Sequence, residues 1–309
     1  MSPMGFAVRT SRSRLSPRQC GSEKYAPAAD AVFGVNDPRR VACRLAALSR
    51  GNRPSPEANM TLRAIAIRTG AGFADLVLPR TCAACGESTP PRSPDLCAAC
   101  ATEVMLTVGG DYCRTCGTDR APHLMIDGRC TSCRQGKTVH RFERIVRVGR
   151  YEGALRRLIL RFKREWVLEK LLGRLLADAI EAHIDPAEVD YWVPVPSHWR
   201  RRLVRGFHPT ALLTARAVGR RKARLGSILE MTRFVPQLKG RMTATQRAAA
   251  VKGAFRVTHR RDISGRSVCL VDDVTTTGAT LAEAKRALRE AGARRIYAAV
   301  LAKTSAVRA

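Results

Sequence analysis

Residues 268–280 read VCLVDDVTTTGAT, and this stretch decides the fold class of the chain. Its apolar first part predicts a buried strand of a parallel sheet. The adjacent acids Asp272 and Asp273 then fall at the carboxyl end of that strand, where open α/β sheets bind their ligands. The Thr- and Gly-rich turn brings backbone N–H groups and hydroxyls to the start of a helix, which is a ready site for a phosphate. We therefore expect a sugar-phosphate site here, with Thr280 as the N-cap of the helix.

Two other interpretations compete for this stretch. An apolar strand that ends in two acids also fits the metal-binding acid of a P-loop ATPase, but that class needs a G-x-x-x-x-G-K-[ST] loop. The Gly-Lys-Thr at residues 136–138 has Thr131 where the first Gly should stand, and no strand precedes it. The second alternative is a surface turn that uses its acids and threonines only for capping. Two acids that leave a buried strand directly into Thr-Thr-Thr-Gly argue against this alternative.

The stretch resembles the phosphoribosyl-diphosphate (PRPP) loop of type I phosphoribosyltransferases. In that family a hydrophobic strand, an acid pair and a T-T-G-x-T-like loop follow one another. The acid pair binds the ribose hydroxyls, and the loop holds the 5′-phosphate. The resemblance implies that Asp272 and Asp273 are the catalytic pair and hold the ribose, directly or through Mg²⁺. The implied phosphate cradle consists of Thr275, Thr276, Thr277, Gly278, Ala279 and Thr280.

Four C-x-x-C pairs precede the α/β part of the chain: Cys82/Cys85, Cys97/Cys100, Cys113/Cys116 and Cys130/Cys133. Two such pairs complete one tetrahedral Zn²⁺ site, so four pairs predict two closed, structural sites. Gly86 and Gly117 follow the first and third pairs and permit the left-handed turn of a zinc knuckle. Sequential pairing is the simplest arrangement, and interleaved pairing is the alternative. Disulfides and redox motifs are further alternatives, which a cytosolic location and four copies at ribbon spacing disfavour.

The chain is strongly basic. Its 309 residues carry a formal net charge of +29, and two Cys₄ zinc sites would reduce this to about +25. A charge of this size indicates a polyanionic partner, nucleic acid first and an anionic membrane surface second, with a plain solvation role as the alternative. No apolar run is long enough to predict a membrane span, and no signal peptide is evident. We therefore expect a cytoplasmic protein.

The chain divides into three parts. Residues 1–59 lack a sustained period and are expected to be disordered, with Met60 as a candidate translation start. Residues 60–140 are expected to form an amphipathic helix at 62–78 and a double zinc ribbon. In residues 141–309 strands alternate with helices, which predicts a mainly parallel, doubly wound α/β sheet. We expect strands at 145–148, 189–195, 228–231, 268–271 and 296–301, and helices at 155–162, 168–180, 211–218 and 281–291.

Two basic segments flank the expected site. Arginines at 200, 201, 202 and 205 follow the strand that ends in Val-Pro-Val-Pro at 193–196. They suit a diphosphate, because a guanidinium binds phosphate through two hydrogen bonds, but a solvated helix face is the alternative. Residues 233–252 are also basic, with few large apolar side chains. They are either a loop that closes over a phosphorylated substrate and excludes water or an ordinary exposed loop.

The whole arrangement resembles the ComF family of competence-associated, phosphoribosyltransferase-like proteins. The ribbon cysteines match, and so does the helix that begins after Tyr151-Glu152-Gly153 and ends at Phe162-Lys163. Arg205-Gly206-Phe207 after the Val-Pro-Val-Pro strand matches as well, as do Gln237 and Arg247 before the acid motif. The family usually carries Asn-Gln after Arg-Gly-Phe, whereas this chain has His208-Pro209.

This resemblance implies a type I phosphoribosyltransferase-like domain preceded by a double zinc ribbon, with two structural Zn²⁺ ions, Mg²⁺, and PRPP as ligand or substrate. It implies that Lys163, Arg200 and Arg205 bind PRPP together with the phosphate cradle. The implied role is the handling of single-stranded DNA in natural transformation, with other competence or DNA-processing proteins as candidate partners. No residue identifies an acceptor or a general base. A binding module without turnover therefore stays an alternative, and so does a nucleotide-salvage phosphoribosyltransferase.

Overall fold

The computed structural model describes residues 81–89, 95–138, 142–219, 224–225, 228–235, 242–258 and 263–305. All of them belong to one compact unit of the chain, Val35–Ala309. Three predictions lie outside the described residues: the disordered segment at 1–59, the amphipathic helix at 62–78, and the part of the basic loop at 236–241.

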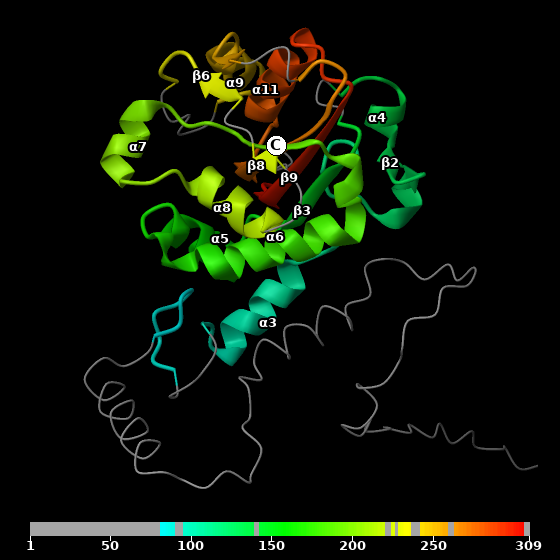
Figure 1. Cartoon of the computed structure of the whole chain (residues 1–309). Coiled ribbons are helices and arrows are strands. Elements are labelled where there is room, and N and C mark those ends of the chain that lie inside the picture. The colour runs from blue at the N-terminus through cyan, green and yellow to red at the C-terminus, as the bar shows by residue number, and fades with distance from the viewer. Residues whose placement is uncertain are drawn as a thin grey trace, which may run out of the picture. The chain divides into compact units, whose positions relative to one another are not determined.

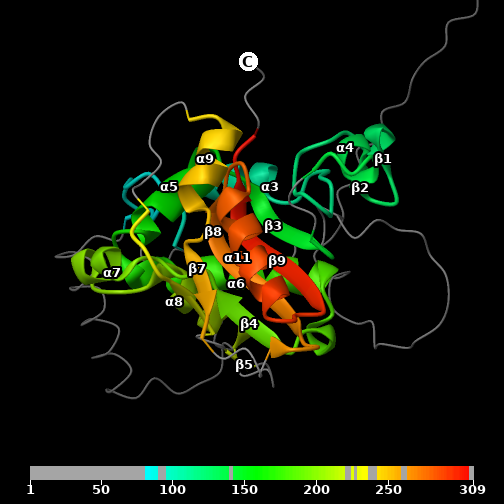
Figure 2. The same cartoon turned by 90° about the horizontal axis from the view of Figure 1, so that it is seen from above.

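A five-stranded parallel sheet organises the larger domain (Figure 2). Val268 and Leu270 of the motif strand pack into one hydrophobic core, and Cys269 and Val271 pack into the other. A strand covered on both faces must be apolar throughout, which is why the motif begins with a continuous apolar run. The prediction of a mainly parallel sheet is therefore confirmed. The strand order is β3 (Ile145–Arg150), β9 (Arg295–Lys303), β8 (Ser267–Thr275), β4 (Tyr191–Pro194) and β5 (Arg224–Leu225), with every neighbouring pair parallel.

Helices cover both faces of this sheet (Figure 1). The first helix of the α/β domain has leucine, isoleucine and phenylalanine at helical spacing between Leu155 and Phe162. These side chains give the helix one fully buried side. One face is covered by α5 (Gly153–Phe162), α6 (Glu169–His183) and α8 (Pro209–Val218). The other face is covered by α11 (Ala279–Glu290), with α9 (Ala244–Val251) packed against α11.

The expected strand at 228–231 forms outside the parallel sheet. β6 (Leu229–Met231) pairs antiparallel with β7 (Phe255–Val257) in a separate two-stranded sheet. Burial alternates along β7, which is the pattern of a strand with one solvated face. The fifth strand of the main sheet is instead β5, whose two residues are too short to leave a periodic pattern in the sequence.

The two ribbons occupy residues 81–138. The second cysteine pair opens α3 (Ala98–Thr107), the fourth opens α4 (Thr131–Arg134), and the hairpin β1 (Met125–Ile126)–β2 (Arg129–Cys130) precedes α4. Backbone hydrogen bonds join the second ribbon to the edge of the parallel sheet. The N–H of Ile145 donates to the carbonyl of Arg114 at 2.7 Å.

Short elements complete the described part of the chain. Helix α7 (Trp199–Arg205) follows β4, and 3-10 turns lie at Pro122–Leu124, Trp166–Leu168 and Pro186–Glu188. Among the described residues, no helix combines the length and apolar character needed to cross a membrane.

Candidate functional site

The eight ribbon cysteines form two clusters, each with its four sulfurs within 4.8 Å of one another. A tetrahedral Zn²⁺ with Zn–S bonds of about 2.3 Å places its sulfurs about 3.8 Å apart. Sulfur–sulfur distances in the clusters are 3.8, 3.7 and 3.9 Å. The residues therefore fit two zinc ions with sequential pairing, and the interleaved alternative does not fit. The first cluster is Cys82, Cys85, Cys97 and Cys100, and the second is Cys113, Cys116, Cys130 and Cys133.

The two clusters repeat one local structure. In the first, the backbone N–H of Cys97 donates to the sulfur of Cys82 at 3.3 Å. In the second, the N–H of Cys130 donates to the sulfur of Cys113 at the same distance. The glycine after each leading pair has a positive φ, 82° at Gly86 and 73° at the corresponding position 117. N–H donors stabilise a thiolate, so this repeated geometry suits metal-bound sulfur.

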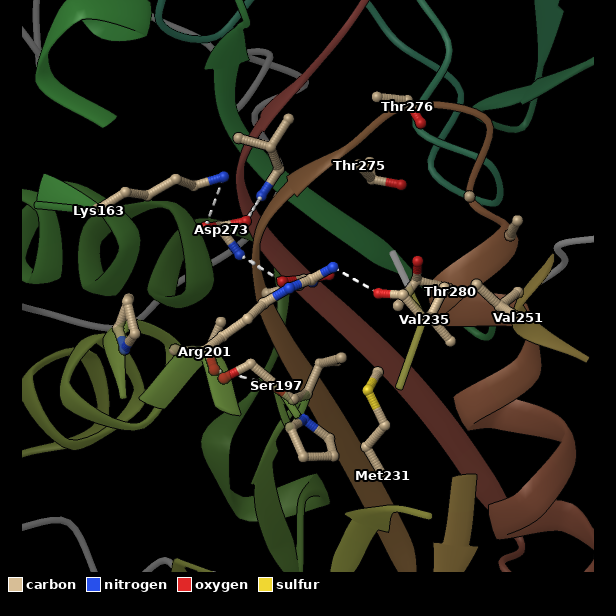
Figure 3. A pocket seen from close by; sticks show the side chains of 18 of the residues that line it. Lys163, Ser197, Arg201, Met231, Val235, Val251, Asp273, Thr275, Thr276 and Thr280 are labelled. Atoms are coloured by element: carbon tan, nitrogen blue, oxygen red, sulfur yellow. Dashed lines mark hydrogen bonds and ion pairs between the residues drawn. The ribbon is translucent and has the colours of Figure 1, made fainter. Parts of the chain in front are cut away.

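A cavity of about 360 Å³ lies at the carboxyl ends of β8 and β4 (Figure 3). This volume is in the range of small-ligand sites. The cavity is lined by the acid pair, by the turn between β8 and α11, by Lys163 at the C-cap of α5, and by cationic side chains from α7 and α9. The sequence motif thus lies at the edge of the sheet where parallel strands present ligand-binding residues.

The acid pair is held by the backbone and by one lysine. Asp272 accepts a hydrogen bond from the N–H of Asp273 at 2.8 Å, and Asp273 accepts one from the N–H of Val274 at 2.6 Å. The second carboxylate oxygen of Asp273 lies 2.9 Å from the Lys163 ammonium. Both residues line the cavity, and Figure 3 shows Asp273 beside Lys163.

The environment changes the proton affinities of these groups. Burial, followed by the charge of Asp273, raises the pKa of Asp272 to about 8. Burial disfavours the charged ammonium of Lys163, but the carboxylates of Asp273 and Asp272 outweigh it and raise the pKa of Lys163. Asp272 thus holds a proton near neutral pH in the free protein. A ligand that brings hydroxyl donors or a cation to this carboxyl group favours its ionised form.

The turn between β8 and α11 has the structure of an anion cradle. The N-cap of α11 is Gly278, whose φ of 82° lies in the region that glycine tolerates best. Thr280 lies inside the first turn, so its predicted N-cap role is wrong: the left-handed backbone at the cap excludes a β-branched residue. No side chain caps this helix. The N–H groups of its first turn lack intrahelical acceptors and are therefore available to an anion.

Two buried hydroxyls on the cavity wall lack a partner. The Oγ1 of Thr277 and the Oγ of Ser197 have no hydrogen-bond partner among the described residues, and both residues line the cavity. Buried polar groups in folded proteins are paired in the large majority of cases. Unpaired hydroxyls at a cavity beside an uncapped helix therefore indicate a polar ligand, and a phosphate supplies the acceptors.

The last strand supports the cradle from behind. Lys303, at the end of β9, donates from its ammonium to the carbonyl of Thr276 at 2.9 Å. The N–H of Thr304 donates to the carbonyl of Thr275 at 3.0 Å. Sequence reasoning missed Lys303, although a lysine just after an apolar strand was a usable signal. The structure shows that Lys303 is buried, which is rare for a lysine.

The three cationic residues that were predicted to bind PRPP do not all lie at the cavity. Lys163 and Arg205 line the cavity, whereas Arg200 is not among its lining residues and lies 5.4 Å from the ring centre of Trp199. Arg201 also lines the cavity and donates to the carbonyl of Val235 (Figure 3). The arginine cluster after β4 thus divides between the cavity and the outer surface.

His208, at the position where the family resemblance implies an asparagine, lies on the cavity wall. Its Nε2 is 3.0 Å from the hydroxyl of Thr210 and 3.3 Å from the N–H of Ser197. Burial and then the charge of Arg202 lower the pKa of His208. The imidazole is therefore neutral near pH 7, and its inner nitrogen is engaged by the wall of the cavity.

Comparison with protein families finds two matching domain families in this chain. The double zinc ribbon domain family matches residues 73–136, and the phosphoribosyl transferase domain family matches residues 227–308. Competence protein F of Haemophilus influenzae is 28% identical over 219 residues, which cover 67% of this chain and 90% of that protein. DNA utilization protein YhgH of Salmonella typhimurium is 28% identical over 241 residues, which cover 74% of this chain and 99% of that protein.

Three further similarities cover less of the chain. A ribose-phosphate pyrophosphokinase of Methanopyrus kandleri is 58% identical over 38 residues, 12% of this chain and 13% of that protein. The structure of the allosteric regulatory enzyme of purine biosynthesis is 24% identical, with a TM-score of 0.29 over 43% of this chain. Glutamine PRPP amidotransferase from B. subtilis is 25% identical, with a TM-score of 0.28 over 42% of this chain. The chain spans 25% of the length of each of these two structures.

Proposed function

The chain is a member of the ComF family, and from this premise we propose that it binds PRPP with Mg²⁺ and handles single-stranded DNA in the cytoplasm during natural transformation. Competence protein F and DNA utilization protein YhgH support the role in DNA uptake. The single observation that most supports PRPP as the ligand is the unpaired Thr277 hydroxyl, which lies beside the uncapped start of α11 and the acid pair.

Each part of PRPP has a chemical counterpart on the cavity wall. The ribose hydroxyls are donors, and Asp272 and Asp273 are oriented acceptors. The 5′-phosphate suits the turn at 275–280 and the first turn of α11. Lys163, Arg201 and the arginine at 205 supply the positive charge that a diphosphate needs.

The acid pair also fits Mg²⁺, which proteins bind through one or two carboxylates together with substrate phosphates. When bound, the ion neutralises the charge of the diphosphate. The protein's own contribution is to orient Asp273 with the Lys163 ammonium and the Val274 N–H, and Asp272 with the Asp273 N–H.

Binding without a defined transfer reaction is the core of this proposal. Transfer to a nucleophile at C1′ needs a proton acceptor near that carbon. Among the described cavity residues, Asp273 is paired with Lys163, and the Nε2 of His208 is engaged by Ser197 and Thr210. We therefore assign no general base, and a phosphoribosyltransferase activity is the alternative that an assay must test.

Calorimetric titration of the zinc-loaded full chain with PRPP and Mg²⁺ tests the proposal. We expect saturable binding that Asp273→Asn abolishes and that Asp111→Asn, a change at an exposed acid of the second ribbon, leaves intact. Ribose 5-phosphate should bind more weakly, because it lacks the diphosphate that the cations recognise. Absence of binding by the unaltered chain would refute the proposal. Release of diphosphate from labelled PRPP with nucleobases or DNA would establish transfer as a further activity.

A further inference from the structure

An exposed cluster of aromatic and cationic side chains lies beside the cavity. Trp199 opens helix α7 and is 49% exposed, and Phe234, in the segment after β6, is 43% exposed. Figure 1 shows α7 at the periphery of the domain, away from the sheet. Exposure of two large rings costs hydrophobic free energy, so exposed apolar surface of this kind marks an interaction site.

The rings and guanidinium groups of the cluster contact one another in tilted and edge-on arrangements. The Arg200 guanidinium lies 5.4 Å from the ring centre of Trp199 and 6.0 Å from that of Phe234, and Arg201 lies 5.6 Å from Phe234. The His198 imidazole is 5.4 Å from Trp199 and 5.2 Å from Phe234. We name these five residues the aromatic–arginine cluster. These contacts pack the rings against the guanidinium groups and the imidazole, although both rings are nearly half exposed.

The cluster is also a site of uncompensated positive charge. Helix α7 contains four arginines at 200, 201, 202 and 205 and no acidic residue. Within the described part of the chain, none of these arginines belongs to an ion pair. Exposed rings beside unpaired guanidinium groups complement a ligand with flat apolar faces and regularly spaced negative charges.

We propose that the aromatic–arginine cluster is a short stacking surface for single-stranded DNA. Bases stack on the exposed faces of Trp199 and Phe234, and the exposed guanidinium groups of Arg200 and Arg202 bind the phosphates between those bases. The inference deepens the DNA-handling part of the proposed function and rests on it. Aromatic residues are only 5% of the chain, so the surface holds a few bases and the remaining charge acts on the backbone.

The combination of exposed rings and adjacent guanidinium groups favours a single strand over other polyanions. Duplex DNA hides its base faces within the stack, so an aromatic surface gains little from it. An acidic peptide would use the arginines but has no need of two fixed rings. A membrane surface would need a continuous apolar face, whereas arginines interrupt the seven residues of α7.

The cluster adjoins the proposed PRPP cavity and shares one residue, Arg201, with its wall. A second cavity of about 450 Å³ is lined by Trp199, Arg202, Leu203, Gly206, Phe207 and His208. His208 lines both cavities, so it forms a shared wall. A strand bound on the outer side of α7 therefore passes next to the PRPP cavity, and DNA and PRPP are expected to bind simultaneously.

Fluorescence anisotropy of labelled oligo(dT) with the zinc-loaded full chain tests the inference. Trp199→Ala is expected to weaken binding roughly fivefold to 150-fold, the range for one stacked base. Trp199→Phe, which keeps a ring, is expected to retain most of the affinity. Trp166→Ala is the matched control, because Trp166 is 60% exposed but lies outside the cluster. This variant should bind oligo(dT) with the same affinity as the unaltered chain.

Salt dependence separates stacking from charge. Arg200→Gln should reduce the slope of log affinity against log salt by about 0.7, and Trp199→Ala should leave the slope unchanged. Equal oligo(dT) affinities for Trp199→Ala and the unaltered chain would overturn the inference. Tighter binding of duplex DNA, oligo(U), polyglutamate or phosphatidylserine vesicles than of oligo(dT) would overturn it as well. Zinc content and melting temperature establish that each variant is folded.

Titration of the same proteins with PRPP and Mg²⁺ keeps the two proposals distinguishable. PRPP binding that survives in Trp199→Ala, while oligo(dT) binding falls, supports the surface as a separate site. A chain that binds oligo(dT) in a Trp199-dependent way but does not bind PRPP would refute the proposed ligand of the cavity and leave the surface standing. PRPP binding together with DNA binding that does not depend on Trp199 would refute the stacking surface and leave the proposed ligand of the cavity standing.

Discussion

Replacement of the Thr277 hydroxyl should affect stability and ligand binding in opposite directions. The Oγ1 atom of Thr277 is buried on the cavity wall and has no hydrogen-bond partner among the described residues. Thr277→Val keeps the branched shape of the side chain and removes the unpaired polar atom. The free protein should therefore become more stable, and binding of PRPP should become weaker.

The magnitudes follow from the two states of the hydroxyl. An unsatisfied buried polar group costs about 1–3 kcal/mol, so Thr277→Val should raise the free energy of unfolding by up to that amount. For a domain of this size each kcal/mol raises the melting temperature by about 2–4 °C. A hydrogen bond to a charged phosphate contributes about 1.5–3 kcal/mol, so the dissociation constant for PRPP should rise roughly 10- to 150-fold.

Urea unfolding of the ligand-free chain and calorimetric titration with PRPP measure the two effects. Thr276→Val is the matched control for stability, because Thr276 is exposed and the change should alter unfolding by less than about 0.5 kcal/mol. A Thr277→Val variant that is less stable than the unaltered chain, or that binds PRPP equally well, would refute the assignment of this hydroxyl to the phosphate.

Three further predictions follow from the site and the ribbons. Because burial and Asp273 raise the pKa of Asp272 to about 8, the folded state keeps a proton that the unfolded chain loses above its ordinary pKa of 3.8. The stability of the free protein should therefore fall from about pH 4 to about pH 8, and Asp272→Asn should remove this component in urea unfolding across that range. Lys163→Met removes the ammonium that pairs with Asp273 and should destabilise the chain by about 1–3 kcal/mol. This loss is smaller than for a fully buried pair, because both groups keep some exposure. An unchanged urea midpoint would contradict the prediction. Metal analysis should find two zinc ions per chain and one in Cys113→Ser, so a single ion in the unaltered chain would contradict the double ribbon.

Much of the fold could be predicted because its signals are local. The apolar run at 268–271 predicts a strand covered on both faces, and the structure shows Val268 and Cys269 in opposite cores. Helical spacing between Leu155 and Phe162 predicts α5 in the same way. The two-residue strand β5 and the antiparallel pairing of β6 with β7 could not be predicted, because neither leaves a periodic pattern over enough residues.

The site was predicted less completely, for a related reason. The motif identifies the acid pair and the turn, but the N-cap is Gly278 and not Thr280, because the turn requires a left-handed backbone at that position. Four arginines close together after β4 are indistinguishable in the sequence. The path of α7 turns Arg201 and Arg205 toward the cavity and places Arg200 against Trp199.

The sequence by itself determined which chemistry is present: eight cysteines in four pairs, two acids at the end of a buried strand, and a Thr- and Gly-rich turn before a helix. Residues within a few positions of one another determine these features, so they can be read from the order of the chain. Only the tertiary structure decided which groups meet. It grouped the cysteines sequentially, brought Lys163 of α5 to Asp273 of β8, and placed Lys303 behind Thr276. These contacts depend on how helices and strands pack, because packing joins side chains that are far apart in the sequence.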